Sequence, residues 1–133
     1  MSVPGDRLCT LWTFPNHRLC SEVARVATPA WALDIKVEGN LAAIGVQGRE
    51  GDFGLVLVDI SDPPNPRVVA EFSAPGWHGV HNLYLYKERA YLAHTESPGL
   101  TILDISDPAN PVISGSWDRI IPLPATVCST GLL

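Results

Sequence analysis

The sequence predicts an all-β fold of about two four-stranded antiparallel blades of a β-propeller, too few to close the ring. The first observation is a direct repeat: residues 54–66 return as residues 99–111, at a shift of 45 positions, with nine of the 13 residues identical. The second is a composition of 46% apolar and 17% charged residues with 12 prolines and 11 glycines, which is typical of a globular all-β chain with many turns. The third is the period, because about 45 residues is the length of a propeller blade. A β-sandwich is the alternative, and it explains a direct tandem repeat less well.

The first copy covers about residues 31–76 and is predicted to contain four strands. We expect them at residues 33–37, 41–46, 55–60 and 68–72. Gly39 lies in the first turn, where glycine readily adopts the positive φ that a tight hairpin requires.

The second copy covers about residues 77–117, with strands expected at 82–86, 90–95, 100–105 and near 112–117. A hairpin that turns at Glu88 would pair Tyr86 with Ala90 and Asn82 with His94, because antiparallel partners keep a constant sum of residue numbers. The third strand of each copy is almost continuously apolar. Such strands are expected to be covered on both faces, as neighbouring blades of a propeller provide.

The repeats occupy residues 21–117, and the segments on either side carry fewer signals. A strand at residues 22–27 is expected to be the outer strand of a preceding blade, because residues 26–31 parallel residues 72–77. Trp31 and Trp77 are best explained as packing between neighbouring blades. Residues 1–20 and the tail 118–133 remain unassigned. Of the cysteines, Cys9, Cys20 and Cys128, all are expected to be free thiols, with a Cys9–Cys20 bridge as the alternative.

Each third strand runs at its end into the sequence Asp-Ile-Ser-Asp-Pro. Short polar side chains at a strand end hydrogen-bond nearby backbone N–H groups, and proline fixes φ at the turn. Six residues are therefore predicted to have a structural role in the turns: Asp59, Ser61, Asp62, Asp104, Ser106 and Asp107. Calcium binding is the minor alternative, because a calcium site needs six or more oxygen ligands.

Residues 99–108 and their twin, residues 54–63, resemble the LVIVD repeat, and residues 81–83 and 90–93 are similar to it as well. The resemblance covers about residues 31–117. This repeat is found in bacterial and archaeal proteins, many of them surface-exposed, and is expected to form propeller blades. The resemblance implies a cell-surface or secreted protein, although no signal peptide is present in this chain. It implies no activity and no catalytic residues.

Three histidines, His78, His81 and His94, form the one candidate site in the sequence. We expect them to gather at one mouth of the second blade, where imidazoles can bind zinc or copper or transfer protons. The alternatives are the lining of a ligand pocket and a purely structural role. The structural role is favoured because the corresponding positions of the first copy include Asp34 and Val46 rather than histidine. No cofactor is predicted.

The predicted function is that of a non-catalytic binding or scaffold segment whose partner is a protein or a glycan. The alternative is part of a copper- or zinc-dependent propeller enzyme that uses the three histidines. No G-x-S-x-G or glycine-rich phosphate motif occurs. A net charge of −5 with scattered basic residues argues against nucleic acid as a partner. No stretch approaches the roughly 20 apolar residues of a membrane span.

The number of copies also bears on the partners. A closed propeller has about 4–8 blades, so two blades need further ones. Either the chain is a fragment of a longer protein, or several copies assemble into a ring. The first interpretation is favoured, because the chain starts and stops part-way through a repeat.

Overall fold

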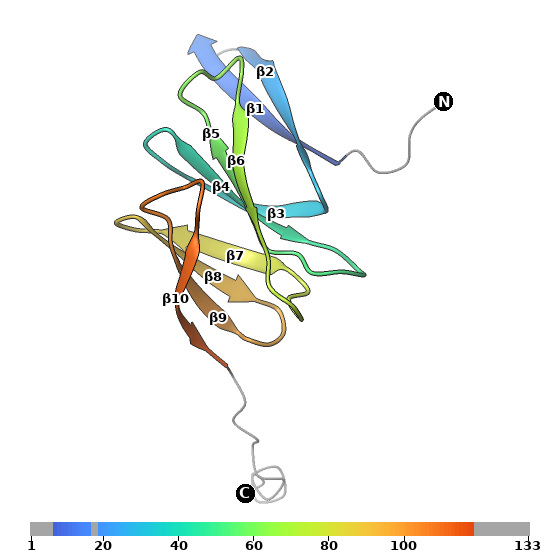
Figure 1. Ribbon diagram of the computed structural model, residues 1–133. Helices are drawn as coiled ribbons and strands as arrows, with labels where there is room; N and C mark the ends of the chain where they lie inside the picture. Colours follow the sequence, from blue (N-terminus) through green and yellow to red (C-terminus); the bar gives the residue numbers. More distant parts are fainter. Residues whose placement is uncertain (1–6, 17–18, 119–133) are drawn as a thin grey trace, which may run out of the picture.

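The computed structural model of the chain describes residues 7–16 and 19–118, with side chains from residue 21 onward. Every element in this part of the chain is a β-strand, and the strands form three antiparallel sheets (Figure 1). Two sheets have four strands each and the third has two. The all-β prediction with two four-stranded units is therefore confirmed.

The first four-stranded sheet follows the chain in simple order, because each strand pairs with the next. Its strands are β3 (Trp31–Glu38), β4 (Leu41–Gln47), β5 (Leu55–Asp59) and β6 (Arg67–Phe72). Their ends differ from the predicted ones by at most two residues. Gly39 turns β3 into β4 with a φ of +59°, a region that glycine enters without the steric penalty of a Cβ atom.

The second four-stranded sheet repeats this arrangement. Its strands are β7 (Val80–Leu85), β8 (Arg89–His94), β9 (Leu100–Asp104) and β10 (Val112–Trp117). Even the irregularities recur. The first strand of each sheet bulges at Leu33 or His81, and the fourth bulges at Val69 or Ser114. Because a bulge bends and twists its strand, the two sheets share a curvature as well as an order.

The hairpin between β7 and β8 has a two-residue turn. Lys87 and Glu88 both have positive φ, +48° and +59°. Tyr86 and Arg89 exchange backbone hydrogen bonds of 3.0 and 3.1 Å on either side of them. Two positive φ values in a two-residue loop match the right-handed twist of the flanking strands. The centre of the turn therefore lies between Lys87 and Glu88 rather than at Glu88.

This turn changes the register that the sequence predicts for the hairpin. The predicted pair of Asn82 with His94 is wrong, since His94 pairs with Val80 after the bulge. The predicted pair of Tyr86 with Ala90 is wrong by one residue, because Tyr86 is already part of the turn. His94 consequently lies beside the start of β7 instead of beside its middle.

The third sheet is the hairpin of β1 (Arg7–Asn16) and β2 (Leu19–Thr28). The strand predicted at residues 22–27 is confirmed as part of β2. Its partner β1 lies in the segment for which the sequence analysis assigns no element. The side chains of Cys9 and Cys20 and all of Cys128 lie outside the described part of the structure, and so does the tail from residue 119.

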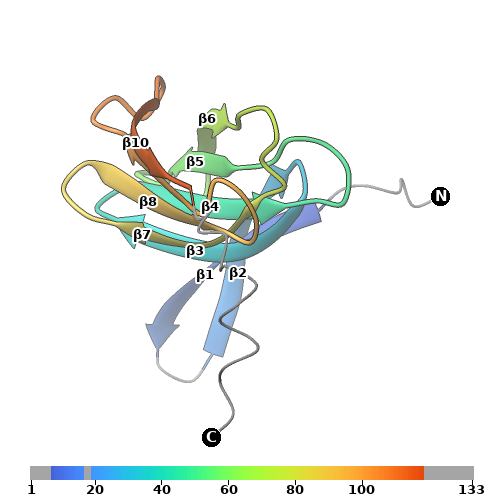
Figure 2. The same ribbon diagram turned by 90° about the horizontal axis from the view of Figure 1, so that it is seen from below.

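The sheets are stacked with the first four-stranded sheet in the middle. In Figure 1 the second sheet lies below it and the hairpin β1–β2 above it. Figure 2 shows the first strands of the two large sheets, β3 and β7, along one side of the molecule and the fourth strands, β6 and β10, along the other. One apolar cluster fills the space between the two large sheets, and a second joins the middle sheet to Val26 of β2 and the adjoining Ala30.

The third strands differ in how far they are covered. Leu55, Val56, Leu57 and Val58 of β5 are all buried, so β5 is covered on both faces as predicted. In β9 burial alternates, because Thr101 and Leu103 face the first sheet while their neighbours face outward and are half-buried. Cover on both faces therefore holds for the third strand of the middle sheet and not for the third strand of the second sheet.

The two tryptophans expected between blades behave differently. Trp77 is buried between the two large sheets, with its ring centroid 5.8 Å from that of Phe72 and 4.5 Å from that of His94. Trp31 is exposed, so the expectation is wrong for this residue. The reason is the length of the connection. Trp31 is the first residue of β3, whereas Trp77 precedes β7 by three residues and can turn inward.

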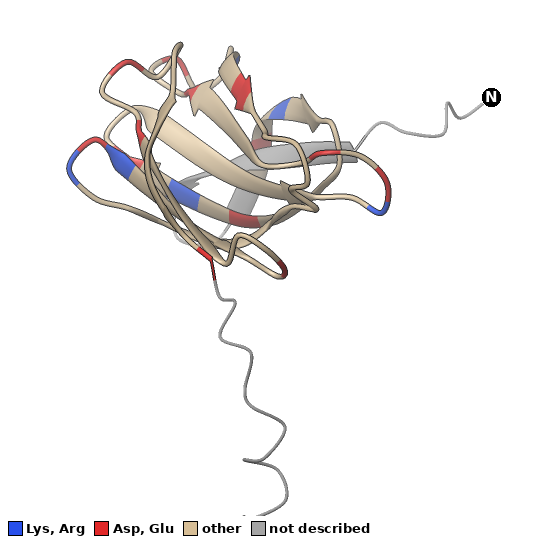
Figure 3. Ribbon diagram, turned by 60° about the horizontal axis from the view of Figure 1, so that its bottom comes forward, with Lys and Arg blue, Asp and Glu red and all other residues tan. Residues whose placement is uncertain are grey.

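Charged residues lie mainly on the turns and strand ends, with a few inside the strands, as the coloured ribbon of Figure 3 shows. The buried strand β4 carries none, and β5 carries only Asp59 at its end. No helix among the described residues is long and apolar enough to cross a membrane.

Candidate functional site

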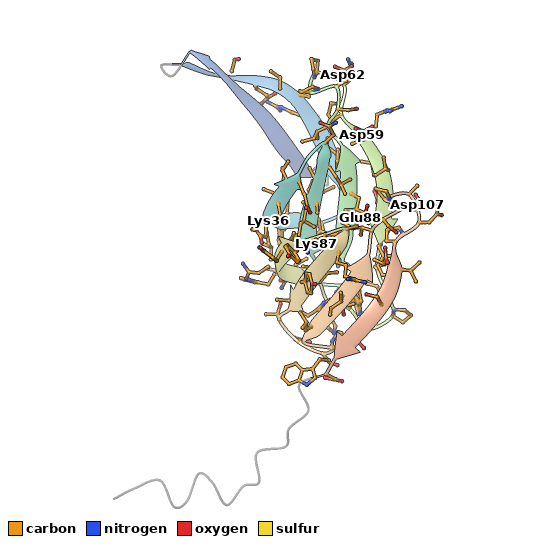
Figure 4. All side chains as sticks on the ribbon, turned by 90° about the vertical axis from the view of Figure 1, so that its left-hand side faces the viewer. Lys36, Asp59, Asp62, Lys87, Glu88 and Asp107 are labelled. Carbon is orange, nitrogen blue, oxygen red and sulfur yellow. The ribbon has the colours of Figure 1, made fainter. Side chains whose placement is uncertain are left out.

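The turn after each third strand is built from its own side chains. Asp59 Oδ1 accepts a hydrogen bond of 2.9 Å from the backbone N–H of Ser61. In the second repeat Asp104 Oδ1 accepts one of 2.9 Å from the N–H of Ser106 and one of 2.7 Å from its hydroxyl. Figure 4 shows Asp59 at this turn of the first sheet. These aspartates end their strands by capping the backbone that follows.

The second aspartate of each turn binds an asparagine three residues later. Asn65 Nδ2 donates to Asp62 Oδ2 at 2.9 Å, and Asn110 Nδ2 donates to Asp107 Oδ2 at 2.7 Å. Each aspartate carbonyl also accepts the backbone N–H of its asparagine. The predicted turn residues thus hydrogen-bond with one another and with the local backbone, and a cation would have to displace these donors.

The same hydrogen bonds keep the first aspartates charged. The backbone N–H of Ser61, more than any other group, lowers the pKa of Asp59. The hydroxyl of Ser106 and then its N–H lower the pKa of Asp104. Both effects arise because a donor favours the carboxylate over the carboxylic acid. These turn hydrogen bonds are therefore stronger with the carboxylate than with the carboxylic acid.

The three histidines of the second repeat each have a different partner. His78 Nε2 lies 3.4 Å from a carboxylate oxygen of Glu96, and both side chains are exposed. His81 is exposed too, with Nδ1 2.7 Å from Oδ1 of Asn82. His94 is partly buried and packs against the ring of Trp77. Within the described residues, no three His, Cys, Asp or Glu side chains are grouped so that they could hold a metal ion.

His94 is held by both of its ring nitrogens. Nδ1 lies 3.1 Å from the carbonyl oxygen of Gly79, and Nε2 lies 3.1 Å from the hydroxyl oxygen of Thr101. A carbonyl only accepts, so we assign the proton to Nδ1 and let Nε2 accept from the hydroxyl of Thr101. Burial lowers the pKa of His94, and the bond to Gly79 only partly opposes this effect. The geometry therefore favours a neutral imidazole that fixes the start of β7 to β8 and β9.

A polar contact that the sequence does not reveal joins the two large sheets. Asp34 of β3 accepts the backbone N–H of Leu83 of β7 at 2.9 Å. Its other oxygen pairs with the ammonium group of Lys36. Burial alone would raise the pKa of Asp34, but these hydrogen bonds outweigh it and lower the pKa. Because β7 is an edge strand, it has no neighbouring strand on one side to accept the backbone N–H of Leu83. Asp34 accepts that N–H instead.

Two open hollows flank the first sheet. One, of about 370 Å³, lies where the turn of the second repeat meets the first sheet, and Leu41, Val69 and Pro108 contribute to its lining. The other, of about 420 Å³, lies at the corner between β2 and β3, where the guanidinium of Arg49 is 5.8 Å from the ring centroid of Trp31. Neither hollow contains one of the three histidines.

The comparison with protein families accounts for the repeated strands and turns. The model of the LVIVD repeat matches residues 31–73 and 81–119. The chain belongs to the LVIVD-repeat family. The first match runs from the start of β3 to just past β6, and the second from the second residue of β7 to just past β10. One LVIVD repeat is therefore one four-stranded sheet in this chain. No curated protein matches the chain.

The outward face of the second LVIVD repeat carries an aromatic patch. Tyr84 and Tyr91 are directly paired across β7 and β8, with ring centroids 6.4 Å apart. In the same register Tyr91 pairs with Ile102, and Leu100 pairs with Trp117. Tyr84 and Trp117 are exposed. We call these five residues the aromatic face. The sequence does not single out these tyrosines, because no signal in the chain shows that this sheet has one open side.

The second repeat packs on one face of the first repeat. The aromatic face is the corresponding face of the second repeat, and its residues are bulkier. Gly45 lies in that covered face, and a Cβ atom there would come within 2.9 Å of the carbonyl oxygen of Val80. The same register position of the second repeat is Ala93, beside Leu100. Tyr91 likewise stands where the first repeat has Ala43. A third repeat could not approach the aromatic face as closely as the second approaches the first.

Proposed function

We propose that the chain is a non-catalytic binding segment of an LVIVD-repeat protein and that the aromatic face of its second repeat contacts a protein partner. The observation that carries this proposal is the exposure of Tyr84 and Trp117 on a sheet whose opposite face packs against the first sheet. Tyrosine and tryptophan are enriched at protein interfaces, because they bury a large area and lose little conformational entropy. The bulk of Ala93 and Tyr91 favours a partner other than a further repeat in the same packing.

The test is site-specific cross-linking in the cells that make the protein. A photoactivatable benzoylphenylalanine replaces Tyr84 in one variant and Trp31, an exposed aromatic residue of the first repeat, in the control. We expect a discrete cross-linked protein from position 84 and none of the same size from position 31. Equal products from both positions, or none from position 84, would contradict a partner at the aromatic face.

A glycan is the second class of partner, since sugar rings also stack on aromatic side chains. Binding to an array of glycans that is lost in Trp117→Ala and kept in Trp31→Ala would assign the face to a glycan instead of a protein.

The metal-dependent enzyme is supported less well by the positions of the histidines. His94 uses both ring nitrogens within the fold, and His78 and His81 have partners of their own. Metal analysis of the purified protein tests this alternative. Stoichiometric zinc or copper that is lost in His81→Ala would favour the enzyme over the binding segment.

A further inference from the structure

The hairpin β1–β2 has the register of half a repeat. Its pairing bulges at Val23 in β2, as the pairing of β5 with β6 bulges at Val69 and that of β9 with β10 at Ser114. In all three hairpins the second pair after the bulge joins residues eight positions apart: Thr13–Ser21, Asp59–Arg67 and Asp104–Val112. The hairpin β1–β2 differs only beyond this point, where it continues past a second register shift to one more pair, Asn16 with Leu19. We infer from the bulge and from the equal spacing of the pairs beside it that β1 and β2 are the third and fourth strands of another repeat.

The family match does not extend to this hairpin, and the turn shows why. Where the two complete repeats have Asp, Ser and Asp, the hairpin has Thr13, Pro15 and Asn16. These residues cannot form the aspartate-capped turn that defines the repeat in sequence. The relation is therefore visible in the register and not in the motif.

A half repeat covers only half of the sheet beside it. Val26 belongs to the same apolar cluster as Ile44 of β4 and Val56 of β5, so the two central strands of the first sheet are covered. Its first strand is not covered: Ile35 is 41% exposed and Val37 is 55% exposed.

The same positions of the second sheet show what full cover would do. Leu83 corresponds to Ile35 and Leu85 to Val37, and they are 5% and 9% exposed. They are buried because β3 and β4, the first two strands of the preceding repeat, pack against β7. Leu33 provides an internal comparison. It is 44% exposed, and its counterpart, the bulged residue His81, is exposed even where a complete repeat lies alongside.

We propose that the outer edge of β1, together with Ile35 and Val37, is a docking site for the first two strands of an LVIVD repeat. The occupant is a β-hairpin like β3–β4, whose second strand pairs with β1 and whose face covers Ile35 and Val37. Among the described residues no strand pairs with that edge of β1. An open strand edge beside an exposed apolar row is the arrangement that added strands recognise. The site also continues the established interface between β2 and the first sheet.

The interface between the two large sheets specifies the chemistry of this hairpin. The contacting strand β4 has Ala43, which is fully buried, and Gly45, which leaves no room for a Cβ atom. Asp34 of β3 contributes the acceptor for a backbone N–H of the neighbouring sheet. The docked hairpin therefore has small residues in its second strand and an aspartate or asparagine in its first.

The experiment supplies this hairpin from the chain's own sequence. A copy of residues 31–54 replaces residues 1–8, so that the copied β4 leads into β1 as β4 leads into β5. Hydrogen exchange of the β1 amides is compared between this completed chain and the unmodified one. We expect exchange in β1 to slow by about tenfold or more, because edge amides become paired.

Point variants show whether Ile35 becomes buried. Ile35→Ser is expected to leave the urea midpoint of the unmodified chain nearly unchanged and to lower that of the completed chain clearly. Leu33→Ser serves as the matched control and is expected to have the same small effect in both. Unchanged exchange in β1, or equal effects of Ile35→Ser in the two chains, would overturn the proposal.

A second measurement applies if the completed chain does not fold. A synthetic peptide with the sequence of residues 31–47 is added to the unmodified chain, and exchange in β1 is followed with increasing peptide. Slower exchange that saturates supports the docking site, and no change at millimolar peptide refutes it. Neither measurement involves Tyr84 or Trp117, so its outcome is independent of the proposed partner at the aromatic face.

Discussion

His94 makes hydrogen bonds at a position where the first repeat has only apolar packing. The same register position of the first repeat is Val46, which is buried in an apolar cluster. In the second repeat Thr101 is fully buried, so its hydroxyl needs a partner, and Nε2 of His94 supplies one. The histidine is thus explained by a buried threonine on the neighbouring strand rather than by a ligand.

The first prediction follows from the neutral state of His94. Because burial lowers the pKa of His94 in the folded chain below its ordinary value of 6.5, the unfolded chain takes up a proton at higher pH than the folded chain. The free energy of unfolding therefore falls as pH decreases below about 6.5. We expect this loss of stability in urea denaturation followed by tryptophan fluorescence between pH 7.5 and 5.

Substitution separates His94 from the other histidines in this pH range. His94→Gln should remove most of the loss between pH 7.5 and 5, whereas His81→Gln, at an exposed position, should leave it unchanged. A loss of stability that persists in full in His94→Gln would show that another group titrates.

At the scale of the strands, Asp34 is the polar link between β3 and β7. Asp34→Ala removes the acceptor of the Leu83 N–H, and a buried donor left without a partner costs about 1–3 kcal/mol. We expect the urea midpoint to fall accordingly. Asp34→Asn should restore much of the stability, since an amide oxygen can accept the same hydrogen bond.

Glu38→Ala is the control for Asp34. It removes an exposed carboxylate from the same strand and should change the free energy of unfolding little. Equal effects of Asp34→Ala and Glu38→Ala would contradict a specific link to β7.

The positions of the strands could be predicted because their signals are local. Apolar runs and the Asp-Ile-Ser-Asp-Pro turns lie within a few residues of the elements that they define. Eight of the ten strands in the described part of the chain follow from them. The register could not be predicted, because it depends on backbone conformations that residue type does not dictate. Lys87 and Glu88 adopt positive φ although neither is a glycine or an asparagine, and this alone moves the hairpin by one residue.

The contacts that join one sheet to another could not be predicted from the sequence either. Asp34 and Leu83 are 49 positions apart, and nothing in either residue indicates that they meet. In the sequence, the tyrosines of the aromatic face cannot be distinguished from buried aromatic residues of a strand. Only the stacking of the sheets shows that one side of the second sheet is open. Local turn residues such as Asp59 could be assigned a role, because their partners are two residues away.

At the scale of the whole molecule, the described chain consists of two complete repeats and the outer half of a third. The central strands of the middle sheet, β4 and β5, owe their burial to this half repeat on one side and to the second repeat on the other. An LVIVD repeat alone would leave both faces of its apolar strands in water, so stability depends on neighbours, as in other repeat proteins. The hairpin β1–β2 is accordingly a structural requirement of the first repeat.

The last prediction tests this requirement through Val26, the residue of β2 in the apolar cluster that joins the hairpin to the first sheet. Val26→Asp places a carboxylate without a partner against Val56 and Val58, and an uncompensated buried charge costs about 3–5 kcal/mol. Val112→Asp makes the same change on an exposed outer strand of the second repeat and should cost far less. Urea denaturation of both variants measures the difference. If Val26→Asp lowered the free energy of unfolding as little as Val112→Asp does, the stability of the first sheet would not depend on packing against the hairpin β1–β2.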